Sequence, residues 1–156
     1  MECPGRRAAQ HVPVCAGAGA AEYGGRWNSP GRPVIYASGS LSLAMLEQLA
    51  QTGTGRLPHN QVFIEITIPD DVSIERVGAS DIPGWASADR QASRTFGDCW
   101  LTDARPCVLL VPSAIVPTEQ NVAINPAHAD FARIRTSASR TLKWDQRIKT
   151  YMVGRG

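Results

Sequence analysis

The sequence has little net charge, few aromatic residues and few histidines. Its formal net charge is +2, and aromatic residues make up 6% of its 156 residues. This composition is typical of an ordinary globular protein and argues against a nucleic-acid-binding protein. No apolar run approaches the roughly 20 residues that a membrane-spanning helix needs. The three histidines, His11, His59 and His128, lack the spacing of a zinc site, so no metal is expected.

Disulfides and a secretion signal are also not expected. The four cysteines, Cys3, Cys15, Cys99 and Cys107, contain no C-x-x-C pair. A chain of this length can bury an adequate core without cross-links, so free thiols are predicted. The first twenty residues carry charges but no apolar segment of the signal-peptide kind, which predicts a cytoplasmic location. The length fits one domain covering residues 1–156.

Hydrophobic periodicity predicts alternating strands and helices. Apolar residues at helical spacing indicate a helix over 40–52, with Ser40 as its cap. Strict alternation over 61–68 indicates a strand with one buried face. The further predicted elements are strands over 33–37, 72–77, 107–111, 121–124 and 131–136, and a helix over 86–102 interrupted near Gly97. The predicted fold class is therefore α+β.

Several common catalytic motifs are missing. The stretch GAGAAEYGG has neither the Lys-Ser/Thr ending of a P-loop nor a preceding strand, and no G-x-G-x-x-G fits a strand-to-helix junction. Rossmann-type dinucleotide binding is therefore not supported. The sequence VPSAI around Ser113 lacks the G-x-S-x-G of a nucleophile elbow, so Ser113 is not expected to be an acyl-transfer serine.

A loop rich in turn-forming residues, GGRWNSPGRPVIYAS at 24–38, leads into a predicted strand. Loops on rigid elements often carry binding groups, so Arg26 is a candidate. Taken singly, each residue also has a structural interpretation: Arg26 as a surface charge, Trp27 as core packing and Tyr36 as a sheet residue. Glu47 lies just outside the apolar stripe of its helix, and its position alone predicts a solvated side chain.

The joint pattern is more specific than any single residue. The loop motif is followed by an S-x-x-x-A-x-L-E helix, then GDCWL, VPSA and NPAH. In this order the motifs resemble the RES domain of bacterial toxin–antitoxin modules. The arginine, glutamate and serine that name that family fall on Arg26, Glu47 and Ser113. The resemblance runs from about Gly19 to about Arg147. The N-terminal ECPGRRAAQHVPV differs from the apolar strand with which the family usually begins.

The resemblance implies a fold like that of diphtheria-type ADP-ribosyltransferases, with a split central sheet, and NAD+ as substrate. Glu47 would stabilise the positive charge that develops on the ribose when nicotinamide leaves. Arg26 would bind the pyrophosphate. Tyr36 would offer an aromatic face to the nicotinamide, while Ser113 and Asn125 would contribute hydrogen bonds to the same pocket.

The resemblance also implies partners, and the reaction stays open at its last step. Transfer of ADP-ribose to a protein is favoured slightly, with NAD+ glycohydrolase or phosphorylase activity as the alternative. An antitoxin of the Xre helix-turn-helix type is implied, and contact with DNA would belong to the antitoxin. A non-enzymatic binding module is the other class considered, because residues 130–156 hold seven Lys or Arg against two Asp.

Overall fold

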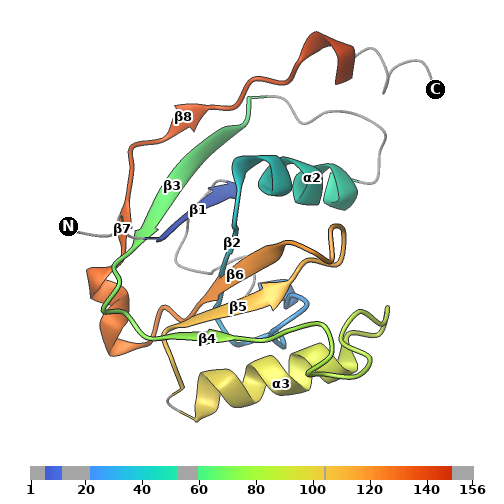
Figure 1. Cartoon of the computed structure of the whole chain (residues 1–156), viewed down its shortest axis with the longest axis vertical. Helices are drawn as coiled ribbons and strands as arrows, with labels where there is room; N and C mark the ends of the chain where they lie inside the picture. Colours follow the sequence, from blue (N-terminus) through green and yellow to red (C-terminus); the bar gives the residue numbers. More distant parts are fainter. Residues whose placement is uncertain (1–5, 12–21, 53–59, 104, 149–156) are drawn as a thin grey trace.

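The computed structural model describes residues 6–11, 22–52, 60–103 and 105–148 as a mixed sheet with helices packed on it (Figure 1). Its elements in chain order are β1 (Arg6–His11), β2 (Ile35–Ser38), α2 (Leu41–Thr52), β3 (Val62–Ile68), β4 (Ile74–Arg76), α3 (Gln91–Thr102), β5 (Val108–Pro112), β6 (Gln120–Ile124), the 3-10 helix η1 (Ala129–Arg133), β7 (Arg135–Thr136) and β8 (Arg140–Thr141). The predicted α+β class is confirmed. None of the helices in these residues is long and apolar enough to cross a membrane.

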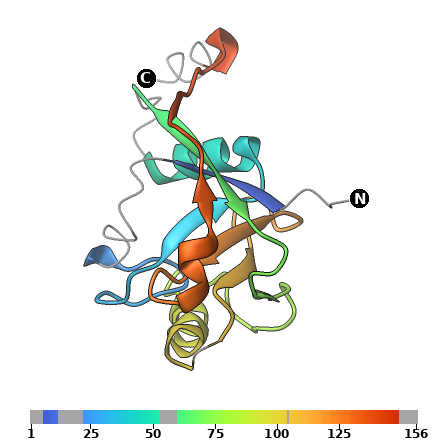
Figure 2. The same ribbon diagram turned by 90° about the vertical axis from the view of Figure 1, so that its left-hand side faces the viewer.

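The strands form one sheet in the order β4-β5-β6-β2-β1-β3-β7, and β8 also pairs with β3. The β4–β5 pair is parallel and the other pairs are antiparallel. β1 meets β2 at the pair Ala9–Ser38 but pairs with β3 along its whole length. The sheet is therefore divided into two halves, as the resemblance implies. Figure 2 shows the C-terminal strands running beside β3.

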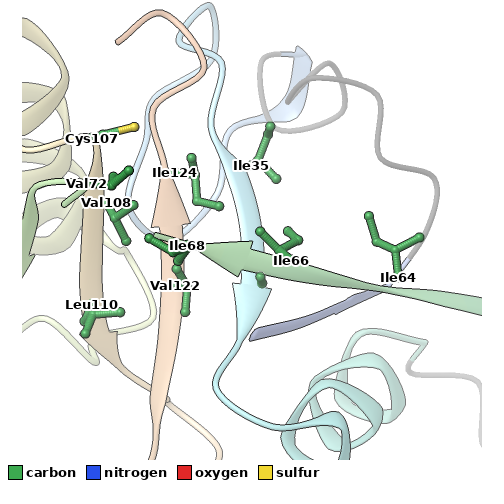
Figure 3. Close-up of a cluster of buried hydrophobic side chains, with 11 residues drawn as sticks. Ile35, Ile64, Ile66, Ile68, Val72, Cys107, Val108, Leu110, Val122 and Ile124 are labelled. Atoms are coloured by element: carbon green, nitrogen blue, oxygen red, sulfur yellow. The ribbon is translucent and has the colours of Figure 1, made fainter. Parts of the chain in front are cut away.

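The larger core lies between these two halves. Alternate residues of β3 are buried, as the period of two predicts. In Figure 3, Ile68 at the end of β3 lies beside Val122 and Ile124 of β6. The cluster contains Ile35, Ala37, Ile64, Ile66, Ile68, Val72, Cys107, Val108, Leu110, Val122 and Ile124. Because β3 and β6 are not neighbours in the sheet, this packing folds one half over the other.

A second core lies on the opposite face of β2, β5 and β6, where α3 packs. Its buried members are Trp27, Val34, Val77, Trp85, Trp100, Leu109, Val111 and Ala123. Three of the four tryptophans therefore pack between α3, the sheet and the loop that precedes β2. This core fixes that loop against α3.

Helix α2 begins close to its predicted start, whereas α3 begins several residues later than predicted. Ser40 caps α2, because its Oγ accepts a hydrogen bond of 3.1 Å from the Leu43 N–H, as predicted. The expectation of a helix over 86–102 broken near Gly97 was wrong: α3 begins at Gln91 and continues through Gly97. A Cβ at Gly97 would lie 1.9 Å from the carbonyl oxygen of Trp27. Glycine is needed there for close packing, not for a break.

Two further segments differ from what their sequence patterns indicate. The N-terminal segment forms strand β1, although its sequence does not resemble the family's apolar strand. The strand expected over 131–136 is mostly the 3-10 helix η1, followed by the short strand β7. The His128 Nδ1 accepts a hydrogen bond of 3.0 Å from the Asp130 N–H and so caps η1. Cys99 and Cys107 are free thiols, as predicted, while Cys3 and Cys15 lie outside the described residues.

Candidate active site

Glu47 lies on α2 and contacts the sheet through its carboxylate. Its Oε1 accepts hydrogen bonds from Ser113 Oγ at 2.8 Å and from Asn121 Nδ2 at 2.5 Å. The residue is half-buried, so the solvated side chain that spacing alone predicts was wrong. Among the residues that the structure describes, no hydrogen bond reaches Oε2. One carboxylate oxygen is thus fixed and the other is available.

Ser113 follows β5 and is fully buried. Its Oγ accepts hydrogen bonds from the N–H groups of Ile115 and Val116, both at 3.1 Å. A hydroxyl has one proton and two acceptor positions. The Ser113 proton is therefore directed to Glu47, and the hydroxyl has no capacity left for a ligand. The structure brings Ser113 and Glu47 together, as the resemblance implies.

Asn121 at the start of β6 is a site residue that the sequence analysis missed. Its Oδ1 accepts a hydrogen bond of 2.8 Å from Ser38 Oγ, and its Nδ2 donates to Glu47. Ser38 and Asn121 are cross-strand partners in the β2–β6 pairing. The available signal was a polar residue at the first position of the strand predicted over 121–124, whose other residues are apolar. The sequence alone does not reveal that Asn121 lies opposite Ser38, because this depends on the register between β2 and β6.

Arg26 lies in the loop before β2. Its Nη1 donates to the carbonyl oxygens of Trp85 at 3.1 Å and Ser87 at 3.3 Å. Burial lowers the pKa of Arg26, the neighbouring charge of Arg90 lowers this pKa further, and the negative charge of Glu47 opposes both effects. Arg26 is therefore oriented by backbone carbonyls and lies within electrostatic range of the Glu47 carboxylate.

Tyr36 holds the loop by its hydroxyl group. The hydroxyl donates to Asn28 Oδ1 at 2.6 Å and accepts from the Trp27 N–H at 3.0 Å. Burial raises the pKa of Tyr36 well above its usual range. Trp27 is buried and stacks on Trp85 with 6.1 Å between ring centroids, which confirms that it packs the loop. A contact of Tyr36 with nicotinamide stays a prediction.

Comparison with known proteins agrees with this geometry. Residues 5–145 match the family model of the RES domain. The chain belongs to the RES domain family. It is 42% identical over 137 residues, 85% of each chain, to the Prs ADP-ribosylating toxin of Sphingobium sp. (strain YBL2). It is also 36% identical over 127 residues to Toxin Res of Photorhabdus laumondii, covering 80% of this chain and 81% of that one.

A solved structure shows the same fold. The crystal structure of the M. tuberculosis MbcT–MbcA toxin–antitoxin complex matches this RES domain with a TM-score of 0.74 and 16% sequence identity. The match covers 96% of this chain and 90% of that one. The arrangement of strands and helices is therefore that of a chain in this complex, although few residues are shared.

Asn125 lies elsewhere in this RES domain. It follows the last residue of β6, at the opposite end of the strand from Asn121. Its Oδ1 accepts a hydrogen bond of 3.0 Å from the Ala127 N–H and so closes the NPAH turn. The structure does not bring Asn125 to Glu47, and its contribution to a ligand pocket stays a prediction. Among the described residues, no group of acidic, histidine or cysteine side chains could hold a metal ion.

The cluster suits a reaction in which positive charge develops close to a fixed carboxylate. A carboxylate held by two donors needs no reorganisation when charge appears beside it, and such preorganisation is an effective form of catalysis. The guanidinium of Arg26 supplies charged donors that match a phosphate. The fixed carboxylate thus suits a developing cation, and the guanidinium suits an anion.

Proposed function

We propose that the chain is the toxin of a toxin–antitoxin pair, that it cleaves the nicotinamide–ribose bond of NAD+, and that it transfers ADP-ribose to a cellular protein. The observation that carries this proposal is the Glu47 carboxylate, held by Ser113 and Asn121 within electrostatic range of Arg26. We also propose that the protein acts in the cytoplasm.

In the proposed reaction the bond between C1′ of the ribose and the nicotinamide nitrogen breaks, and its electron pair leaves with nicotinamide. The ribose becomes cation-like in the transition state. Glu47 stabilises this charge through Oε2, while Oε1 stays bonded to Ser113 and Asn121. A nucleophile on the acceptor then bonds to C1′ and loses its proton. Arg26 binds the diphosphate.

Ser113 and Asn121 act through Glu47 in this proposal. All the hydrogen-bonding positions of the Ser113 hydroxyl are used by protein groups. Ser113 is therefore a positioning residue for the carboxylate, rather than a donor to nicotinamide or phosphate. Tyr36 similarly holds the loop that carries Arg26.

The acceptor and the partner are proposed from the relatives. A relative of 42% identity is named a Prs ADP-ribosylating toxin, so Prs is the first acceptor to test, and water and phosphate are the alternatives. The structural relative is a toxin in a complex with its antitoxin. We therefore expect a cognate antitoxin here, of the Xre helix-turn-helix type.

The test is nicotinamide release from NAD+ by the purified chain, with Prs, phosphate or buffer as acceptor. We expect release with Prs and a mass increase of Prs by one ADP-ribose. Glu47→Gln should lower the rate by at least about 100-fold, because the ribose loses its carboxylate. Glu75→Gln is the control, because Glu75 lies on β4 and pairs with Arg105.

The possible outcomes separate the alternatives. Release in buffer alone would indicate a glycohydrolase, and release dependent on phosphate would indicate a phosphorylase. Wild-type protein that releases no nicotinamide with any acceptor would contradict enzymatic function and favour a binding module. A Glu47→Gln protein as active as the Glu75→Gln control would contradict the assignment of Glu47.

A further inference from the structure

A second arginine, Arg90, immediately precedes α3 and shares a hydrogen-bond acceptor with Arg26. The Ser87 carbonyl oxygen accepts hydrogen bonds from Arg26 Nη1 at 3.3 Å and from the Arg90 N–H at 3.1 Å. Arg26 and the backbone of Arg90 therefore converge on one atom. Arg90 has φ of 58°, in the left-handed region that side-chain-bearing residues rarely adopt. Such strain persists only where the surrounding structure holds it, and it often marks functional positions.

Arg94 adds a third positive charge to this group. Its Nε donates a hydrogen bond of 2.9 Å to the carbonyl oxygen of Gly25, the residue before Arg26. In the part of the chain that the structure describes, no carboxylate forms an ion pair with Arg26, Arg90 or Arg94. The nearby Asp89 accepts from the Gln91 N–H instead.

Three like charges held together without a paired acid repel one another, and the charge of Arg90 does lower the pKa of Arg26. Asp98, an acid on α3, pairs instead with Arg32 at 3.6 Å and accepts hydrogen bonds from Ser29. Glu47 is the carboxylate whose negative charge raises the pKa of Arg26, against the effect of Arg90. An anionic ligand would relieve this repulsion, and arginine forks match phosphate oxygens.

We propose that Arg90 joins Arg26 in binding the diphosphate of NAD+. The inference rests on the proposed function, because it assigns a further specificity residue to the same substrate. Arg90 is exposed, so its side chain is accessible to a ligand entering from solvent.

The test measures binding of ADP-ribose by calorimetry and NAD+ cleavage by nicotinamide release. Arg90→Ala should weaken ADP-ribose binding about tenfold and raise KM for NAD+ by a similar factor, with kcat changed less than about twofold. Arg90→Lys should recover part of the loss, because lysine keeps the charge without the fork. Arg135→Ala, an exposed arginine on β7, removes the same charge elsewhere and should bind like wild type.

Arg90→Gly separates binding from folding. Glycine adopts a positive φ without strain, so this variant should melt no lower than wild type and still bind ADP-ribose about tenfold more weakly. ADP-ribose affinity in Arg90→Ala equal to that in Arg135→Ala would overturn the inference. If wild-type protein binds ADP-ribose through Arg90 yet releases no nicotinamide, the proposed function fails and the diphosphate site stands.

Discussion

At the scale of single residues, the Asn121 amide is oriented by its two neighbours. Its Oδ1 faces the hydroxyl of Ser38 and its Nδ2 faces the carboxylate of Glu47. A carboxylate can accept a hydrogen bond but cannot donate one. An amide at position 121 can therefore bond to both neighbours at once, which an ionised acid there cannot do.

We predict that the Asn121→Asp variant will need a higher pH than wild type to become active. The substitution places a second carboxylate at the 2.5 Å contact with Glu47. Two carboxylates this close cannot both ionise easily, so the pKa of the pair should rise by at least about one unit. The acidic limb of the kcat profile should move to higher pH. Asn121→Ala should lower kcat without moving that limb, and equal profiles for the two variants would contradict the prediction.

Tyr36 gives a prediction for alkaline stability. Burial raises the pKa of Tyr36 in the folded state, whereas an unfolded tyrosine ionises near about pH 10. Its contribution to stability is therefore complete below about pH 10 and is lost above it, by up to about 1.4 kcal/mol per pH unit. Urea unfolding between pH 9 and 11 should show a shallower decline for Tyr36→Phe than for wild type. Tyr23 is exposed, and a hydrogen bond with Glu22 raises its pKa, so Tyr23→Phe should alter the decline less than Tyr36→Phe does.

At the scale of elements, α3 and the loop before β2 form one unit. Asp98 of α3 accepts hydrogen bonds from the N–H and the hydroxyl of Ser29, at 3.0 and 2.6 Å. Arg94 bonds the Gly25 carbonyl, and Gly97 lies against the backbone of Trp27. Contacts from little more than one turn of α3, at Arg94, Gly97 and Asp98, thus hold the loop on which Arg26 lies.

We predict that Gly97→Ala will loosen this unit. A methyl group 1.9 Å from the Trp27 carbonyl oxygen must move the loop or the helix. We expect a loss of about 3 kcal/mol of unfolding free energy and a fall of roughly 6–12 °C in Tm. KM for NAD+ should also rise because Arg26 moves. Thr95→Ala, on the exposed side of α3, should leave Tm within about 2 °C of wild type.

The elements were predictable where a local pattern determined them. The alternation in Val62–Ile68 predicts β3 because one of its faces is buried. In contrast, RRAAQH has no strand pattern and forms β1 through its pairing with β3 on one side and β2 on the other. Such pairing outweighs intrinsic preference. Gly97 was misinterpreted for the same reason, because its role depends on Trp27, seventy positions earlier in the chain.

The site was predictable only in part. Arg26, Glu47 and Ser113 were identified from the resemblance, and the structure joins the last two by a hydrogen bond. Neither Asn121 nor Arg90 was found. Asn121 is brought to Glu47 by strand register, and Arg90 is brought to Arg26 through a carbonyl oxygen in a turn. Sequence patterns describe neighbours along an element and not contacts of this kind.

At the scale of the whole molecule, the small net charge of +2 is consistent with the proposal that DNA contact belongs to an antitoxin. We predict that the antitoxin inhibits by laying its C-terminal segment over the site of Arg26 and Glu47. A peptide carboxylate can pair with the arginine that otherwise binds phosphate. Saturating ADP-ribose should therefore weaken the complex, and antitoxin without its C-terminal segment should no longer block nicotinamide release. Full inhibition by the shortened antitoxin would contradict occlusion.

The hydrogen bonds of Glu47 also determine at what stage of synthesis its carboxylate can be held in place. Ser113 is 66 positions and Asn121 is 74 positions later in the chain than Glu47. Strand β6, which carries Asn121, must pair with β2 before the carboxylate is held. Most of the chain must therefore be synthesised before the Glu47 carboxylate is fixed, since such distant contacts form late in folding. Under the proposed function, a nascent chain has Arg26 and Glu47 before it can cleave NAD+.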